Sequence, residues 1–287
     1  MEAFVSWLEN NGHLQQKDAK DGYTAIKNGY DERYKIAEVK NCNYTSFAFS
    51  SFESTKEVEP GIIHFCGEVE KGNGIQTQAI GIPVFGNIKP HTGKYMVKVA
   101  AGQVGPIFKA AVKNVTINGE DFERGLQAGR TYIASVWVHK SNLTAKLSVK
   151  IDGAITTPQV SAPYSDMKSM IASSSDALQI GEWKQLNVVI EVPENYVSSG
   201  GGGTNDLRVE LSSGTGLSYF DDLVFHPVDA QFTGYVMDKR LGLVMSVINN
   251  ENFYTRFKYD NAGNLVATYK ETANGEKVIS TNKYQYK

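Results

Sequence analysis

The most distinctive acidic feature of the sequence is the pair Asp221-Asp222, which lies inside the otherwise apolar segment 219–225. If this segment is a strand, adjacent side chains point to opposite faces, so at most one of the two carboxylates enters a common site. A buried carboxylate without a partner is costly. The pair therefore predicts a hydrogen-bonding, cationic or metal partner elsewhere in the chain.

Catalytic motifs are scarce. The five histidines, at positions 13, 64, 91, 139 and 226, stand singly, and no two are four residues apart as in a helical zinc site. The sequence contains no Gly-x-Ser-x-Gly turn. Two carboxylates could still meet for glycoside hydrolysis, but 31 acidic residues make such a meeting expected by chance. We expect no enzymatic activity and keep a glycan-active enzyme as the remote alternative.

The two cysteines carry little information. Cys42 and Cys66 are 24 residues apart, with no CxxC pair and no Cys/His set of metal-ligand spacing. One pair in 287 residues is far below the density of a disulfide-stapled scaffold. This favours two free thiols, although a single disulfide stays open.

Charge and hydropathy exclude two classes of partner. Lys and Arg total 29 against 31 Asp and Glu, so the net charge of −2 draws the chain neither to nucleic acid nor to an anionic membrane. No segment approaches the roughly 18 apolar residues that span a bilayer. The first residues also lack the basic and apolar regions of a signal peptide. We expect no nucleic-acid partner and no membrane insertion.

The elements that must position any site are strands. Polar and apolar residues alternate with the period of two that indicates half-buried strands, over residues 94–99, 131–138, 147–151, 186–192 and 207–211. Short helices are expected only at residues 2–9 and 165–172. Asp152-Gly153 has the composition of a two-residue hairpin and predicts a link between neighbouring antiparallel strands. The glycine-rich segment 198–205 is interpreted as a mobile hairpin tip.

The last sixty residues contain a repeat. Residues 235–244 align with residues 257–266, which places Asp238 and Asp260 22 residues apart. Each copy is a predicted hairpin with an Asp-led turn closed by glycine, and one hairpin cannot bury its own face. Turns are expected at residues 238–242, 249–252, 260–263 and 274–275, and the resulting sheet should pack on the preceding domain or pair with further copies.

The second copy resembles the YD repeat of Rhs and teneurin-type proteins, because Tyr259-Asp260 is followed by Gly263, Asn264 and Leu265. The first copy is degenerate, with Met237 before Asp238. In that family the repeats stack into a spiralling β-sheet shell. Two copies cannot close a shell, so the resemblance implies a small antiparallel sheet appended to another domain.

Three marks upstream together resemble a galactose-binding-like jelly roll: Ser51-Phe52-Glu53, the segment 90–95 (PHTGKY), and Asp221-Asp222 on the last strand. Such carbohydrate-binding-module domains are linked to YD repeats in Bacteroidetes surface proteins. About eight to ten alternating segments without helical crossovers independently favour a two-sheet sandwich. We expect an all-β chain: an N-terminal extension (1–43), a jelly-roll β-sandwich (44–228) whose Glu53 lies near Asp222, and a YD-repeat-like sheet (229–287).

The resemblance also implies site residues. In the jelly-roll family a structural calcium is held by residues matching Glu53, Thr92, Lys94 and Asp222; without metal, Asp222 would cap backbone N–H groups or pair with Lys94. Candidate sugar-stacking aromatics are Trp7, Tyr164, Tyr196 and Tyr219, whereas Trp137 and Trp183 are interpreted as core. The predicted function is a non-catalytic extracellular or cell-surface module, structural or interacting, within a larger surface protein; a carbohydrate-binding module with structural calcium is the alternative.

Overall fold

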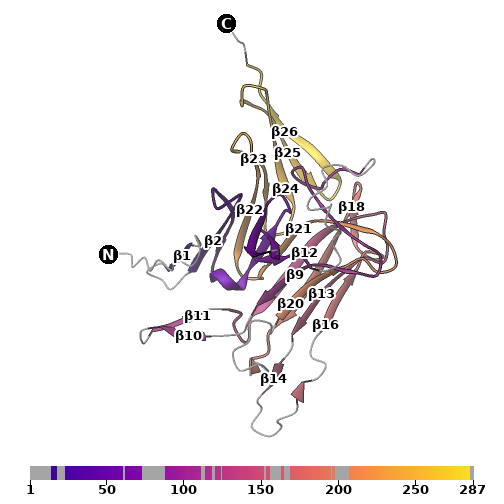
Figure 1. Ribbon diagram of the computed structural model, residues 1–287. Coiled ribbons are helices and arrows are strands. Elements are labelled where there is room, and N and C mark those ends of the chain that lie inside the picture. Colours follow the sequence, from indigo (N-terminus) through magenta and orange to yellow (C-terminus); the bar gives the residue numbers. More distant parts are fainter. Residues whose placement is uncertain are drawn as a thin grey trace.

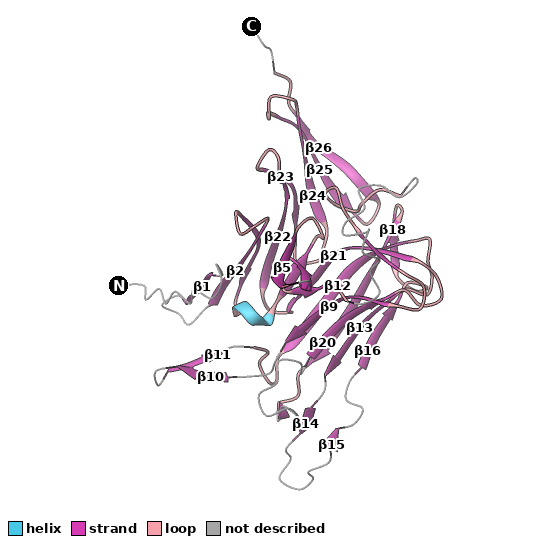
Figure 2. Cartoon of the chain, viewed as in Figure 1, coloured by secondary structure: helices cyan, strands magenta, loops and turns pink. Residues whose placement is uncertain are grey.

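The computed structural model describes residues 14–17, 23–60, 62–72, 88–110, 114–117, 120–123, 125–151, 153–155, 163–164, 169–194, 196–197 and 207–284. Within these residues the chain is all-β apart from one 3-10 turn, Tyr44–Ser46, and its β-sandwich architecture confirms the predicted fold class (Figures 1 and 2). The predicted helix at residues 2–9 and the glycine-rich tip at 198–205 lie outside the described residues. No described helix could span a membrane.

The first sheet of the sandwich, here called the central sheet, is antiparallel throughout. Its strands are β17 (Leu178–Ile180), β18 (Trp183–Glu191), β12 (Thr131–His139), β21 (Ser218–Pro227) and β4 (Ala48–Ser50), in that order, and β8 (Val97–Val99) also pairs with β21.

The second sheet, here called the outer sheet, packs against it. Its order is β16 (Ser169–Ser173), β13 (Lys146–Ile151), β20 (Leu207–Ser212), β9 (Val104–Ala110), β7 (Val69–Glu70), β6 (Ile62–Phe65) and β5 (Thr55–Glu59). One continuous apolar core fills the space between these two sheets, with Val136 and Phe225 from the central sheet and Leu147 and Val209 from the outer sheet.

The third sheet, here called the terminal sheet, joins the two ends of the described chain. Its order is β1 (Leu14–Lys17), β2 (Tyr23–Gly29), β3 (Tyr34–Lys40), β22 (Gln231–Asp238), β23 (Leu243–Ile248), β24 (Tyr254–Tyr259), β25 (Leu265–Thr272) and β26 (Gly275–Thr281). Strand β3 pairs with β22, for example Val39 with Phe232. The sheet is therefore larger than the appended C-terminal sheet expected, because strands from residues 1–43 and 229–287 hydrogen-bond to each other.

The central sheet is covered on both faces. Along β21 the side chain of Phe225 enters the sandwich core, whereas the adjacent Val224 packs with Phe49 and Phe232 in a second core under the terminal sheet. All ten residues of β21 are consequently buried. This central position explains why a charged pair on β21 must find its partners inside the protein.

Two local predictions are wrong. Residues 169–172 belong to β16 rather than to a helix, because they pair with β13, where Val149 lies opposite Met170. Gly153 begins β14 (Gly153–Ile155), which pairs with β15 (Pro163–Tyr164) and β19 (Tyr196–Val197) and not with β13. Strands β13 and β14 therefore belong to different sheets, and Asp152 itself lies outside the described residues. A further hairpin comprises β10 (Asn114–Ile117) and β11 (Glu120–Glu123).

The four predicted turns of the tail are confirmed, since each falls between consecutive strands of the terminal sheet. Asp238 Oδ1 accepts the N–H groups of Arg240 and Leu241 at 2.8 and 3.1 Å. Asp260 Oδ1 accepts those of Ala262 and Asn264, both at 2.9 Å. In both turns the aspartate side chain therefore accepts two backbone N–H groups of its own turn.

Candidate functional site

A β-bulge in the middle of β21 places two carboxylates on the same side of the strand. Asp221 pairs with Trp137 and Val224 with Ser135, so two residues of β21 lie opposite one residue of β12. Asp222 occupies the left-handed region, with φ 48°. Such bulges re-aim side chains, and strained non-glycine residues concentrate at functional sites. The expectation that only one of the two carboxylates enters a common site is therefore wrong.

Both carboxylates bind the loop before β8. Asp221 Oδ2 accepts the backbone N–H groups of His91 and Thr92 at 2.8 and 3.2 Å. Asp222 accepts the Thr92 hydroxyl at 2.7 Å and contacts His91 Nδ1 at 2.7 Å. Both aspartates are completely buried. Burial, followed by the charges of Asp222 and Glu53, raises the pKa of Asp221 well above its usual value.

His91 connects this pair to the terminal sheet. Its Nε2 lies 2.9 Å from Glu271 Oε1 on β25, while its Nδ1 binds Asp222 on β21. Burial alone would lower the pKa of His91, but hydrogen bonds to the two carboxylates outweigh it and raise the pKa to about 9. The ring is therefore a cation at neutral pH and stacks on Trp137, with centroids 4.2 Å apart. We call His91, Asp222 and Glu271 the His91 clasp.

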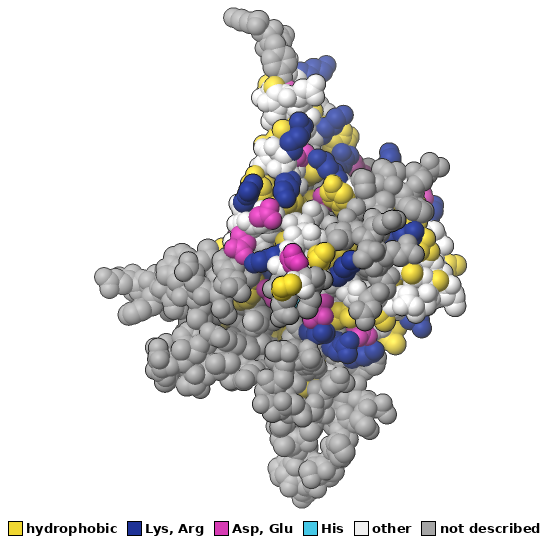
Figure 3. All heavy atoms as spheres, in the orientation of Figure 1, with side chains coloured by type: hydrophobic (Ala, Val, Ile, Leu, Met, Phe, Trp, Pro, Cys, Tyr) yellow, Lys and Arg dark blue, Asp and Glu magenta, His cyan; other side chains and the backbone are white. Residues whose placement is uncertain are grey.

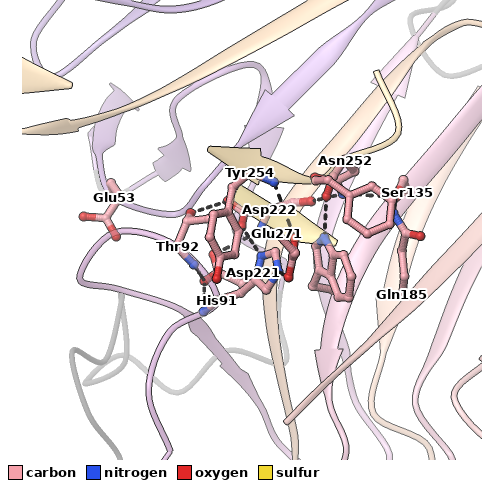
Figure 4. A network of polar contacts seen from close by, with 12 residues as sticks. Glu53, His91, Thr92, Ser135, Gln185, Asp221, Asp222, Asn252, Tyr254 and Glu271 are labelled. Atoms are coloured by element: carbon pink, nitrogen blue, oxygen red, sulfur yellow. Dashed lines mark hydrogen bonds and ion pairs between the residues drawn. The ribbon is translucent and has the colours of Figure 1, made fainter. Parts of the chain in front are cut away.

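The turn between β23 and β24 docks beside the clasp (Figure 4). Asn252 Nδ2 donates to the Asp222 carbonyl at 2.8 Å and to Ser135 Oγ at 3.0 Å. In return, Trp137 Nε1 donates to the Asn252 carbonyl at 2.7 Å. Gln185 Nε2 donates to the carbonyl of Glu251 at 2.6 Å. These hydrogen bonds form a second connection, beside the His91 clasp, between the central sheet and the terminal sheet.

Glu53 lies on its own side of the loop, apart from the other carboxylates in Figure 4. Its Oε1 accepts the N–H groups of Lys94 and Tyr95, both at 2.6 Å. Burial, opposed by these hydrogen bonds, raises the pKa of Glu53 to about 8. Gly93, with φ 59°, has no room for a side chain, since an added Cβ would lie 2.3 Å from Glu53 Oε1.

The residues predicted from the jelly-roll resemblance do come together around one loop. Ser50 pairs with Leu223, which brings Glu53 close to Asp222 as expected. Lys94 turns elsewhere, because its Nζ binds Asp238 Oδ2 on β22 at 2.8 Å. The metal-free alternative for Asp222 is wrong in both its forms: the backbone N–H groups of the loop donate to Asp221, and Asp222 binds the Thr92 hydroxyl and the His91 ring rather than Lys94.

The carboxylates around this loop already accept hydrogen bonds from the protein. Calcium binds carboxylate and carbonyl oxygens, whereas the loop presents N–H and O–H groups that already occupy Asp221, Asp222 and one oxygen of Glu53. Among the described residues, no group of three or more His, Cys, Asp or Glu side chains has the arrangement of a metal site. Calcium bound by Glu53, Thr92, Lys94 and Asp222 stays a prediction.

Of the four predicted sugar-stacking aromatics, the structure describes the side chains of Tyr219 and Tyr196. Tyr219 is only 3% exposed and packs with Met96 and Trp137, so it offers no free ring face. Tyr196 is partly buried against the sandwich core. Trp7 lies outside the described residues, as does the side chain of Tyr164. Trp137 and Trp183 are buried, which confirms their interpretation as core.

A hollow of about 440 Å³ lies where the sandwich meets the terminal sheet, and we call it the junction hollow. Trp183, His91, Tyr254, Glu182 and Glu276 are among the residues that line it. Sequence reasoning missed this site, although His91 stands inside the quoted segment 90–95. Its partner Glu271 carries no local sequence signal, because only the pairing of distant strands brings it there.

Two sequence comparisons find no relative: no family model matches the chain, and no curated protein matches it. Solved structures give low scores. A cyclase from Fischerella sp. TAU in complex with 4-(1H-indol-3-yl)butan-2-one has 9% identity and a TM-score of 0.31, over 63% of this chain and 84% of that one. The CBM22-1–GH10 modules of Clostridium thermocellum endo-1,4-β-D-xylanase 10B, complexed with xylohexaose, have 10% identity and a TM-score of 0.30, over 70% of this chain and 28% of that one. Likeness of this degree identifies neither a family nor a ligand for the chain.

Proposed function

We propose that the chain is a non-catalytic structural and interaction module of a larger extracellular or cell-surface protein of the kind that carries YD repeats. The observation that carries this proposal is the His91 clasp, in which a buried cation joins a carboxylate of the sandwich to a carboxylate of the terminal sheet. Breaking such a pair leaves an uncompensated buried charge. The clasp therefore favours one fixed orientation of the two parts, as a spacer requires.

The groups at the clasp are poorly suited to catalysis. Both ring nitrogens of His91 are bonded to carboxylates, so neither is available to move a proton to or from a substrate. A second histidine, His139, contacts Ser141 Oγ at 2.9 Å. The nitrogen in this contact is Nδ1, which also accepts the Ser141 N–H in a local turn. The other ring nitrogen, Nε2, lies 3.8 Å from Glu182 Oε2, beyond hydrogen-bond distance. This arrangement resembles a turn more than a catalytic triad.

Replacing the central cation tests the proposal. His91→Gln keeps hydrogen-bonding atoms but leaves Asp222 and Glu271 without a counter-charge, so we expect the free energy of unfolding to fall by about 3–5 kcal/mol. Partial proteolysis should then cut first within residues 249–276. His64→Gln, at a half-buried position on β6 outside the clasp, is the control. If His91→Gln unfolds and is cleaved like the control, the clasp does not hold the two parts together and the proposal loses its support.

Carbohydrate binding is the second candidate function. It is supported by the junction hollow, where aromatic rings and carboxylates face the same space. A glycan array probed with the intact chain tests it, because binding of any glycan class above background establishes the activity. If no glycan on the array binds, the structural role is the one candidate function that remains.

A further inference from the structure

A row of rings lines one wall of the junction hollow. His139 and Trp183, at the ends of β12 and β18, have centroids 5.6 Å apart. Trp183 is followed by His91 at 5.8 Å, and His91 by Tyr254 at 5.1 Å. The wall thus passes without interruption from the central sheet to β24 of the terminal sheet. Ring edges and faces of this kind offer apolar contact to the C–H groups of a ligand.

Three carboxylates of the hollow already have cationic partners. Glu182 binds Lys140 at 2.7 Å, Glu271 binds His91 at 2.9 Å, and Glu276 binds Arg256 at 2.5 Å. Lys140 and Arg256 balance Glu182 and Glu276, whereas Glu271 shares the His91 cation with Asp222. Glu182, and Oε1 of Glu276, which accepts one bond from Arg256, keep lone pairs for further hydrogen bonds. The hollow therefore offers acceptor oxygens without a net demand for a charged ligand.

Two glycines at turns also line the hollow. Gly181, between β17 and β18, and Gly275, at the start of β26, have φ values of 58° and 90°. A Cβ added to either glycine would meet no atom within 4 Å. The volume of about 440 Å³ lies within the roughly 300–1,000 Å³ of small-molecule sites.

We propose that the junction hollow binds a neutral sugar ring and that the sandwich and the terminal sheet build this site jointly. Hydroxyl groups donate to Glu182 and Glu276, and the C–H face of the ring contacts Tyr254 and the edge of Trp183. This inference rests on the proposed function, because the site exists only while the clasp holds the two parts together. Ligand binding in turn stabilises the docked arrangement.

Indole N–H resonances of the intact chain give a direct readout. Methyl β-D-galactopyranoside and methyl β-D-glucopyranoside are the neutral probes, and glucosamine and galacturonic acid are the cationic and anionic probes. We expect at least one neutral probe to shift the Trp183 resonance. The Trp137 resonance should stay in place, since its N–H is bonded to the Asn252 carbonyl. A shift with a charged probe alone, or none with any probe up to its solubility limit, would overturn the proposal.

Two variants test the joint construction. Glu182→Gln in the sandwich and Glu276→Gln in the terminal sheet should each weaken binding about three- to tenfold, the effect of impairing one hydrogen bond to a charged acceptor. Glu194→Gln is the matched control, because Glu194 is exposed beyond the opposite end of β18. Unchanged affinity in Glu276→Gln would place the site on the sandwich alone and overturn a joint site. The unfolding measurement on His91→Gln tests the structural role without any sugar. If the sugar titrations show no binding, the proposed structural function is therefore unaffected.

Discussion

His91 Nε2 and Glu271 Oε1 lie 2.9 Å apart although 180 residues separate them in the sequence. The contact crosses from the loop before β8 to the terminal sheet, and Trp137 lies beneath the imidazole. The surface view in Figure 3 displays one face of the molecule, on which Lys, Arg, Asp and Glu side chains are scattered among apolar ones. The charges of the clasp differ from these because they are buried, and its two carboxylates share one cation, His91.

The buried lysine of β2 should make stability depend on pH. Lys27 is fully buried, and its Nζ lies 4.4 and 4.7 Å from the ring centroids of Tyr44 and Phe47 with no hydrogen-bond partner in the described part of the chain. Burial, opposed by the charges of Glu68 and Cys42, lowers the pKa of Lys27 to about 8.

Because the folded protein gives up this proton near pH 8 and the unfolded chain near 10.5, the unfolded state binds more protons between these values, and stability rises with pH there. We expect wild type to gain about 3 kcal/mol relative to Lys27→Met between pH 7 and pH 10.5. Chemical denaturation at several pH values measures the difference. Lys40→Met, at an exposed position of β3, should show no such trend. If the difference in unfolding free energy between wild type and Lys27→Met does not change with pH, the Lys27 amine is not desolvated in the folded protein.

Asn252 should separate backbone strain from hydrogen bonding. It has φ 60° and donates to both Asp222 and Ser135. Asn252→Gly removes the two hydrogen bonds, but glycine adopts the positive φ without strain. Asn252→Ala removes the same bonds and also strains the backbone at this φ. We expect thermal unfolding to show a loss for each, with Ala worse than Gly by about 1–2 kcal/mol. Equal losses would mean that the turn relaxes on substitution.

Local patterns allowed the strands and the tail turns to be predicted from the sequence. Alternation identified β12 and β20, and Asp-led turns with Gly242 and Gly263 fixed the hairpins of the tail. The ordered marks also placed Ser51-Phe52-Glu53 beside Asp221-Asp222. Each of these features depends on neighbours within a few residues or on a resemblance to a fold.

Long-range pairing could not be predicted in this way. Nothing near Val39 indicates that it will pair with Phe232, because either end of the chain could have met another strand. The bulge at Asp222 likewise depends on β21 leaving β8 and joining β4, where Phe220 pairs with Val97 and Leu223 with Ser50. The clasp follows from these pairings, so it was invisible until the sheets were known.

The loop that receives Glu53 should not tolerate a side chain at Gly93. Gly93→Ala would bring a Cβ within 2.3 Å of Glu53 Oε1 at a φ of 59°. Gly102→Ala is the matched control, since Gly102 has a φ of 71° and no atom within 4 Å of an added Cβ. We expect Gly93→Ala to cost about 1–3 kcal/mol more than the control, from overpacking. Similar melting temperatures for the two would show that Glu53 is free to move away.

Calcium dependence distinguishes a hydrogen-bonded loop from a metal site. Since Asp221, Asp222 and Glu53 already accept N–H and O–H donors, we expect the same melting temperature in EDTA and in added calcium. Magnesium at equal ionic strength controls for salt. A rise in melting temperature with calcium alone would establish the structural ion implied by the jelly-roll resemblance, and would require the loop around Thr92 and Lys94 to rearrange.

The terminal sheet should survive limited proteolysis together with the sandwich. Strand β22 pairs with β3, and Phe232 and Val236 share a core with Phe49 of the sandwich. Releasing residues 229–284 would therefore expose this core and leave β3 without its neighbour, which is costly for apolar surface and for a sheet edge. We expect trypsin under native conditions to leave no stable fragment that ends near Val228. Mass spectrometry of the digest, with monomer confirmed by light scattering, measures this; rapid loss of the tail from a monomer would show instead that the terminal sheet needs a partner that the isolated chain lacks.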